Sequence, residues 1–264
     1  MKYHCLVRLG RTAGANRSVK LSFFGTGAGN FRGSRRQMGS ALVEGVLLDC
    51  GAGTTGRLHD VELFDRVDGI LISHLHSDHI AGLFDFLLHT LITGRTRPLT
   101  IVSPPGLAPI LRAMNDVGVM VKDPAELYPF RLIEGLQPAT TIGPWRVESF
   151  PLHHTVYNLG YLLSTDRAKL YYTGDTRQPS VPDGLRADFV IHESTYADRH
   201  TGLAEEFGHS TASQAARAAT VMGARRLFLT HIGSREGTEA EVLREVRAGF
   251  PDSTVAEDRS HHEL

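Results

Sequence analysis

One segment of this chain constrains its fold and function more than any other, a short apolar run that ends in a cluster of ligand-type side chains. Residues 69–73 read Gly-Ile-Leu-Ile-Ser, and His74, His76, Asp78 and His79 follow within six positions. The run is typical of a buried strand, and the apolar periodicity after residue 79 is typical of a helix. The four side chains therefore lie on a loop held at both ends. Imidazole and carboxylate groups are natural zinc ligands, so we expect a metal site at the end of this strand.

Strand-like runs recur along the chain and predict an α/β fold with two sheets. Each run is rich in β-branched or aromatic residues and is bounded by Gly, Pro, Asp or Asn. The runs cover residues 18–24, 41–43, 46–49, 69–73, 99–102, 145–150, 159–164, 169–173, 188–191 and 226–230. The second half repeats the plan of the first, so two mixed β-sheets packed face to face with helices outside fit this order. We expect one domain over residues 1–264.

The helix predicted after residue 79 has one apolar stripe. The i, i+3, i+4, i+7 spacing predicts that its members share one buried face. They are Ile80, Leu83, Phe84, Leu87, Leu88 and Leu91.

Composition limits the class of protein. The chain is 41% apolar and 22% charged, as in ordinary globular domains. It lacks an apolar run of about 18 residues, so we expect no membrane span. A net charge of −1 argues against a surface built to coat nucleic acid. Cys5 and Cys50 are too few for a disulfide framework, which favours the cytoplasm.

Further candidate ligands follow three later strand runs. His153 and His154 come after the run that ends at residue 150, Asp175 after 169–173, and His231 after 226–230. A lone histidine at a strand end is usually structural, but the cluster at 74–79 favours a ligand role for these later residues as well. Asp175 suits a carboxylate that bridges two metals. Asp49, after 46–48, either orients a ligand histidine or caps a turn.

At these positions the sequence resembles the metallo-β-lactamase superfamily. The matching elements are Asp49, His74-Leu-His76-Ser-Asp78-His79, His154, Asp175 and His231. The resemblance implies a four-layer αββα sandwich with two metal ions, most simply zinc with manganese or iron as options, at one edge of the sheets. It implies that one metal takes His74, His76 and His154. The other takes Asp78, His79 and His231, and Asp175 bridges the two.

Within that superfamily the tail resembles the ribonuclease Z branch. Three stretches carry the likeness: His192-Glu193-Ser194-Thr195, Gly208-His209-Ser210-Thr211 and Leu229-Thr230-His231. The resemblance implies that His209 acts near the phosphate and pairs with an upstream acid, which would be Glu206. Asp78, His209 and Glu206 are thus the candidate catalytic residues. Glu193 is either a support for the site or a polar strand end.

The region around His209 itself suits that role. Thr211 and Gln214 form a capping-box pattern, which predicts a helix that continues to Met222. His209 would then lie at the positive end of this helix, where a phosphate is favoured. It could protonate the departing oxygen after attack by a metal-activated hydroxide.

Two departures from the branch concern the substrate. Relatives that process tRNA carry a long basic arm between the positions of His154 and Asp175, whereas this chain has only an apparent hairpin there, 159–164 with 169–173. The loop after residue 29 is also altered. Its Arg32, Arg35 and Arg36, together with Arg235, either hold phosphates or are solvated. RNA 3′-end processing and cleavage of a small or cyclic nucleotide therefore both stay open.

Other functions compete with phosphodiester hydrolysis. The same metals could hydrolyse carbon esters, thioesters or lactones. A nucleic-acid-binding scaffold with a structural metal is less favoured, because structural zinc sites are usually closed and four-coordinate. A redox di-iron centre is also less favoured, since Leu75-His76 offers no carboxylate there. The resemblance further implies a homodimer.

Overall fold

The computed structural model describes residues 18–29, 38–118, 123–233 and 238–264. The basic residues Arg32, Arg35, Arg36 and Arg235, proposed above as phosphate contacts, lie outside these ranges. No helix in the described ranges is both long and apolar enough to cross a membrane.

The described strands form two seven-stranded sheets with the same pairing pattern. Each sheet has three antiparallel pairings followed by three parallel ones. In order, the first sheet contains β14 (His261–Glu263), β1 (Lys20–Gly25), β2 (Ser40–Val43), β3 (Val46–Leu48), β4 (Gly69–Leu71), β5 (Leu99–Ser103) and β6 (Phe130–Glu134). The second contains β7 (Thr140–Ile142), β8 (Trp145–Leu152), β9 (Asn158–Ser164), β10 (Lys169–Tyr172), β11 (Phe189–Glu193), β12 (Arg226–Thr230) and β13 (Ser253–Val255).

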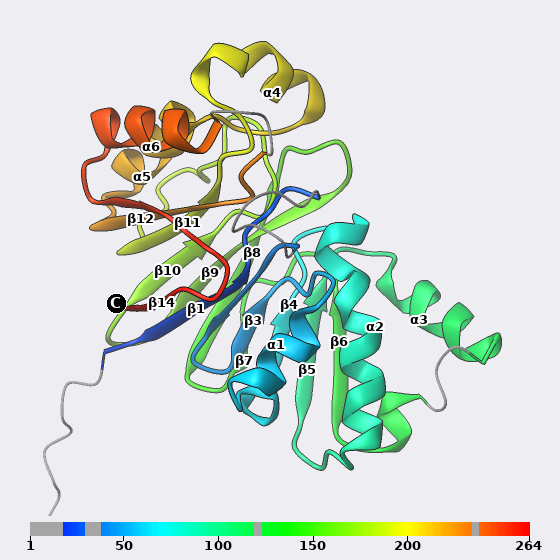
Figure 1. The fold of residues 1–264 in the computed structure, drawn as a ribbon. Helices are drawn as coiled ribbons and strands as arrows, with labels where there is room; N and C mark the ends of the chain where they lie inside the picture. Colours follow the sequence, from blue (N-terminus) through cyan, green and yellow to red (C-terminus); the bar gives the residue numbers. More distant parts are fainter. Residues whose placement is uncertain (1–17, 30–37, 119–122, 234–237) are drawn as a thin grey trace, which may run out of the picture.

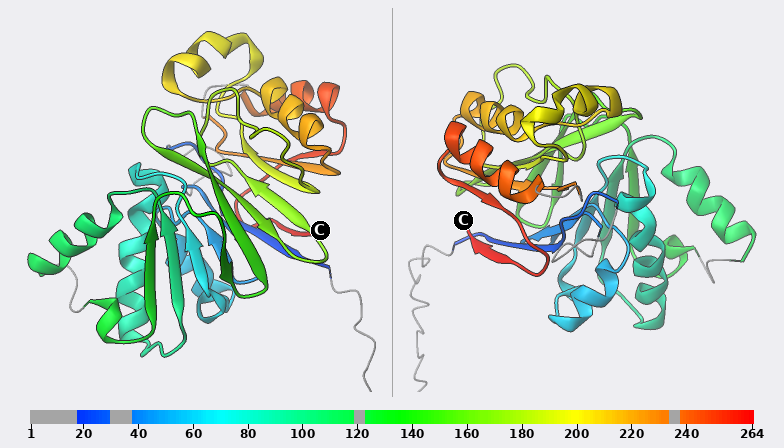
Figure 2. Two further views of the ribbon diagram at one scale, coloured as in Figure 1. Left: turned by 180° about the vertical axis from the view of Figure 1, so that it is seen from behind. Right: turned by 45° about the horizontal axis from the view of Figure 1, so that its top comes forward.

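Helices cover the outer faces of both sheets, as Figures 1 and 2 show. The α-helices are α1 (Thr54–Asp60), α2 (Ser77–Ile92), α3 (Leu107–Asp116), α4 (Thr201–Phe207), α5 (Ala212–Met222) and α6 (Thr238–Gly249). Three 3₁₀ turns are η1 (Phe64–Arg66), η2 (Pro124–Glu126) and η3 (Asp198–His200). Helices α1 and α2 lie against the first sheet, and α5 and α6 against the second.

Three apolar clusters fill the spaces between these layers. The central cluster joins the inner faces of the two sheets and includes Phe23, Trp145, Tyr161 and Phe228. One outer cluster lies under α1 and α2, and another lies under α5 and α6. The fold is therefore the expected αββα sandwich. Because one core joins the sheets, we propose that the chain folds as a single domain.

Two sequence expectations need correction. On α2 the buried side chains include Phe86, whereas Phe84, Leu88 and Leu91 are only half-buried. Phe86 packs against Phe64 of η1, with ring centroids 4.8 Å apart, so α2 contacts a second neighbour besides the sheet. The i, i+3, i+4, i+7 spacing predicts one buried face against the sheet, so it does not predict the contact between Phe86 and Phe64.

Strands β6, β7, β13 and β14 were not predicted. They lie at or next to the sheet edges, and three of them are only three residues long. Their pairing depends on distant partners more than on local apolar alternation. The hairpin expected between His154 and Asp175 is confirmed: β9 and β10 pair antiparallel through a short turn at residues 165–168.

Candidate metal centre

The ligand-type residues meet where the parallel strands end. β4 ends at Leu71, the chain continues in extended form to His76, and α2 begins at Ser77. His74 and His76 therefore lie on the loop, while Asp78 and His79 lie in the first turn of the helix. The second sheet supplies the residues that follow β8, β10 and β12. Strands β10, β11 and β12 are parallel neighbours, and β8 runs in the same direction because β9 pairs antiparallel with both β8 and β10, so these strands end at the same edge.

One group of imidazoles comprises His74, His76 and His154. The three ligand atoms lie within 4.8 Å of one another. The His76 Nδ1 atom is 3.0 Å from His74 Nε2 and 3.3 Å from His154 Nε2. His154 is buried in this group, whereas His153 is exposed. The geometry thus separates the two neighbours that the sequence left unresolved.

A second group comprises Asp78, His79 and His231, again within 4.8 Å. The Asp78 Oδ2 atom lies 3.4 Å from His231 Nε2 and 3.7 Å from His79 Nε2. Burial disfavours the Asp78 carboxylate, but the hydrogen bond to His231 and the neighbouring imidazoles outweigh it and lower the pKa of Asp78 to about 2. Asp78 is therefore ionised at neutral pH, as a metal ligand must be.

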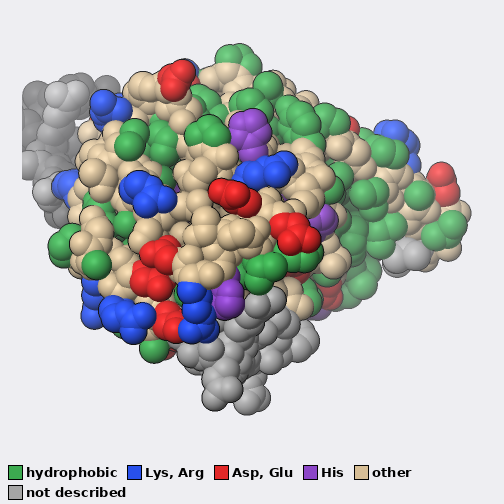
Figure 3. Space-filling view, turned by 90° about the horizontal axis from the view of Figure 1, so that it is seen from above, with side chains coloured by type: hydrophobic (Ala, Val, Ile, Leu, Met, Phe, Trp, Pro, Cys, Tyr) green, Lys and Arg blue, Asp and Glu red, His purple; other side chains and the backbone are tan. Residues whose placement is uncertain are grey.

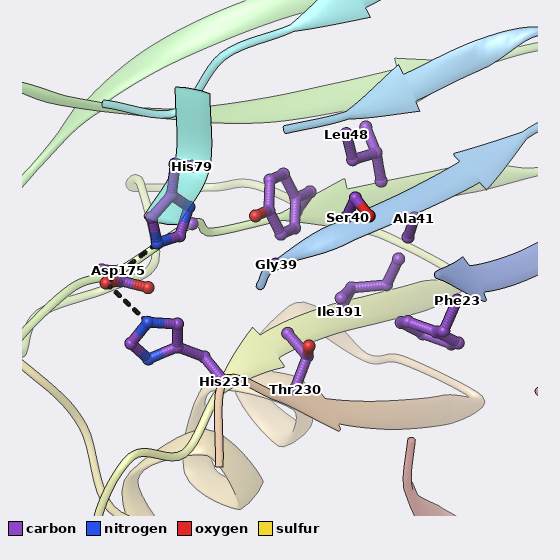
Figure 4. Close-up of a pocket in the computed structure, with 12 residues that line it drawn as sticks. Phe23, Gly39, Ser40, Ala41, Leu48, His79, Asp175, Ile191, Thr230 and His231 are labelled. Carbon is purple, nitrogen blue, oxygen red and sulfur yellow. Dashed lines mark ion pairs between the residues drawn. The ribbon is translucent and has the colours of Figure 1, made fainter. Parts of the chain in front are cut away.

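Asp175 lies between the two groups. Its Oδ2 atom is 3.7 Å from His74 Nε2, 3.3 Å from His79 Nε2 and 3.2 Å from His231 Nε2. Figure 4 shows His79 and His231 on either side of this carboxylate. Within the described ranges, two buried atoms here find no hydrogen-bond partner, Asp175 Oδ1 and His79 Nε2. Buried polar atoms are rarely left unpaired, so this arrangement fits a bound cation.

Hydrogen bonds on the outer side of the imidazoles fix their orientation. The Nδ1 atom of His79 lies 2.7 Å from Asp49 Oδ2, and that of His154 lies 2.7 Å from the Gly208 carbonyl oxygen. The Nδ1 atom of His231 lies 2.8 Å from Thr195 Oγ1. Each outer acceptor holds the proton on Nδ1, which leaves Nε2 free to bind a metal. Burial also lowers the pKa of His74 well below its usual range, which favours the neutral ligand form.

Asp49 combines the two roles that the sequence allowed. Besides the His79 ring, it accepts hydrogen bonds from the backbone N–H of Ser73 at 2.6 Å, the Ser73 hydroxyl at 2.7 Å and the Tyr172 hydroxyl at 2.5 Å. It therefore both fixes the loop and orients an imidazole. Its φ of 55° is in the left-handed region, which Asp tolerates better than most residues.

His209 lies at the mouth of the centre, between a carboxylate and a helix end. Its Nδ1 atom donates to Glu193 Oε1 at 3.0 Å. Helix α5 begins at Ala212 with the predicted capping box, in which the backbone N–H of Thr211 donates to the side-chain oxygen Oε1 of Gln214 at 2.8 Å. Burial lowers the pKa of His209, but the Glu193 charge outweighs this and raises it to about 9.

Glu193 is the acid that contacts His209, where the sequence had indicated Glu206. Glu206 is exposed on α4. Glu193 is fully buried and accepts from the N–H groups of Thr176 at 2.9 Å and Thr195 at 3.0 Å. A catalytic role for Glu206 stays a prediction. Thr195, which bridges Glu193 and His231, was not singled out; its signal was its place in the His-Glu-Ser-Thr stretch.

Comparison with known proteins decides the family. The model of a family described as the β-lactamase superfamily domain matches residues 45–232. The chain belongs to the metallo-β-lactamase superfamily. Within the superfamily it is similar to ribonuclease Z from Salinibacter ruber, with 31% identity over 83% of this chain and 85% of that relative. Family membership and the His/Asp groups imply a metal-dependent hydrolase that binds a divalent ion.

Two crystal structures in the superfamily are also similar. Human tRNase Z, short form, is 27% identical with a TM-score of 0.74, and the match covers 92% of this chain and 98% of that one. The metallo-β-lactamase fold protein YhfI from Bacillus subtilis is 22% identical with a TM-score of 0.77, covering 94% and 100%. The second likeness concerns the fold alone.

Proposed function

We propose that this chain is a dinuclear metal-dependent phosphodiesterase of the ribonuclease Z type, acting on RNA or a small nucleotide. One observation carries the proposal most strongly: His209, held by Glu193 at the start of α5, faces two ligand groups that share Asp175. A phosphodiester is already an anion before it reacts, so a cationic imidazole beside a helix N-terminus attracts it, whereas a neutral carbon ester has no charge for the pair to bind.

The proposed ligands are those that the sequence indicated. His74, His76 and His154 would hold one ion, Asp78, His79 and His231 the other, and Asp175 both. Nitrogen and oxygen donors at this spacing suit zinc, with manganese or iron as alternatives. When bound, such ions act as Lewis acids and lower the pKa of water towards neutrality.

The protein's own residues then account for orientation and proton transfer. The Glu193 carboxylate keeps His209 protonated at neutral pH, with the Nε2–H available as a donor. The N-terminus of α5 favours the negative charge of a phosphate. His209 would donate its proton to the leaving oxygen, which is the role of a general acid.

The short β9–β10 turn bears on substrate size. Since residues 165–168 replace the arm of tRNA-processing relatives, the chain offers fewer contacts remote from the metal centre. Short single-stranded RNA and small nucleotides are therefore candidate substrates alongside precursor tRNA. A homodimer and a cytoplasmic location stay predictions, and the oligomeric state is testable by light scattering.

The test compares ester classes on metal-loaded protein. We expect turnover of bis(p-nitrophenyl) phosphate and little turnover of p-nitrophenyl acetate; cleavage of only the acetate would overturn the proposal. His154→Ala should remove activity and bound metal, whereas His153→Ala, its exposed neighbour, should remove neither. Precursor tRNA, 2′,3′-cyclic and 3′,5′-cyclic nucleotides then rank the natural substrates.

A further inference from the structure

The exposed aromatic side chains of this molecule lie close in sequence to residues of the proposed active site. Within the described ranges only two are exposed, Tyr157 and Phe207, each at 49%. Tyr157 follows the metal-centre residue His154 by three positions, and Phe207 precedes His209 by two. Both exposed rings are thus close in sequence to residues of the proposed active site, where a π-face could contact a ligand.

The two rings belong to adjoining segments. The His154 ring donates to the Gly208 carbonyl at 2.7 Å, which ties the segment after β8 to the end of α4. A Cβ atom at Gly208 would lie 3.0 Å from the backbone nitrogen of Thr155, so only glycine permits this close approach. Tyr157 and Phe207 therefore lie on two segments that meet at His154 and Gly208, and Val156 beside Tyr157 is exposed as well. We call the exposed edge of these two segments the rim.

A cation lies on the same rim. Arg177 follows Asp175 by two residues, and its backbone N–H donates to the His153 carbonyl at 2.7 Å. Its guanidinium contacts the Glu205 carbonyl at 3.4 Å, and no carboxylate among the described residues forms an ion pair with it. The guanidinium is therefore available to a phosphate group.

Among the described residues, the rim combines its one arginine, Arg177, with acidic neighbours. Helix α4 carries Glu205 and Glu206, both exposed, near Phe207. Seen from above, this face of the molecule mixes acidic, basic and apolar side chains, as Figure 3 shows. The described rim residues thus offer little charge to phosphates away from the proposed metal centre, and the exposed rings offer a second kind of contact there.

We infer that Tyr157 and Phe207 form a stacking platform for unpaired nucleobases on the two sides of the scissile phosphate, while Arg177 contacts the adjoining backbone. This inference rests on the proposed function and names its substrate as single-stranded nucleic acid. Every base has a π-face, so such stacking tolerates many sequences. A base within a duplex is not free to stack on a protein ring, so paired ends bind less well.

The test measures affinity separately from turnover. The probe is a hexaadenylate whose phosphorothioate linkages resist hydrolysis, and fluorescence anisotropy reports its binding to metal-loaded protein. Tyr157→Ala and Phe207→Ala should each weaken binding by about 5- to 150-fold, the range for one lost base stack. Tyr157→Phe should restore binding. Leu136→Ala is the matched control, since Leu136 is also 49% exposed but lies between β6 and β7.

A second probe tests for the bases themselves. The same backbone with abasic sugars should bind wild type weakly, and the two alanine variants should bind it as wild type does. The affinity of the full hexaadenylate should change little with salt, because few phosphates are neutralised.

Equal affinity of wild type and both alanine variants for hexaadenylate would overturn the platform. That result, with phosphodiester hydrolysis intact in wild type, would leave the proposed function standing. Wild type that binds hexaadenylate through the two rings but hydrolyses no phosphodiester would instead overturn the proposed function and keep the platform.

Discussion

The two sheets have the same pairing pattern, yet they supply the metal centre in different ways. The first sheet contributes His74, His76, Asp78 and His79 from the loop after β4 and the first turn of α2. The second contributes single residues after separate strands, among them His154, Asp175 and His231. The first contribution depends on local chain geometry, whereas the second depends on strand order and register. In one fold, therefore, part of the site comes from neighbouring residues of a single segment, and the rest comes from residues that only strand pairing brings together.

The buried acids of the two sheets follow the same division. Asp49 after β3 and Glu193 at the end of β11 are both fully buried. Each accepts a hydrogen bond from an imidazole Nδ1, but Asp49 holds a proposed metal ligand, His79, and Glu193 holds the proposed acid, His209. Equivalent supports would therefore serve the proposed metal binding in one sheet and the proposed proton transfer in the other.

The largest expected effect comes from removing the carboxylate that both groups share. Asp175→Ala should abolish loading of both metals and lower kcat/KM by at least about 1000-fold, which corresponds to ~4 kcal/mol. Elemental analysis and phosphodiester turnover measure the two effects. Asp60→Ala, an exposed acid on α1, serves as the control. Retention of two metal equivalents by Asp175→Ala would contradict the bridging assignment.

The next largest effect separates the two buried acids. Asp49→Asn presents an amide group to four donors, so the His79 ring loses its fixed orientation. Metal affinity should fall by about 10- to 100-fold, as is typical when a supporting hydrogen bond is lost. Competition with a chromogenic chelator gives the affinity, and circular dichroism confirms folding. Unchanged affinity would show that His79 needs no outer partner.

Glu193→Gln should lower turnover more than metal affinity, because Glu193 contacts His209 directly but reaches His231 only through Thr195. We expect kcat to fall about tenfold at neutral pH, part of the usual contribution of a general acid. In wild type, His209 is protonated below its pKa of about 9, so activity should fall as pH rises through that value. Without the Glu193 charge the pKa drops, and this alkaline limb should move to lower pH. A pH profile of kcat that does not move would exclude His209 as the acid.

The smallest effect concerns how the helices at the centre begin. Helix α5 starts with a capping box, whereas His76, which precedes α2, makes no capping hydrogen bond with its side chain. Gln214→Ala should lower the free energy of unfolding by about 1 kcal/mol without changing the bound metal. Urea denaturation measures this, with Arg217→Ala on the exposed face of α5 as the control. A loss of metal in Gln214→Ala would show that the cap also positions the site.

The sequence by itself determined the parts that depend on neighbours along the chain. A ligand cluster between an apolar strand and an apolar helix predicts a metal loop, and the capping pattern predicts the start of α5. The alternation of strand runs and turns also predicts two sheets. These features follow from side-chain chemistry and local backbone periodicity, which the sequence displays directly.

Only the tertiary structure decided which distant groups meet. It buried His154 beside His74 and His76 and left His153 exposed. It also placed Glu193, and not Glu206, against His209, and it buried Phe86 of α2 against η1. It also brought two short edge strands, β13 and β14, into the sheets. The physical reason is that these contacts join residues far apart in the chain. Their geometry follows from sheet register and layer packing, which leave little trace in any short stretch of sequence.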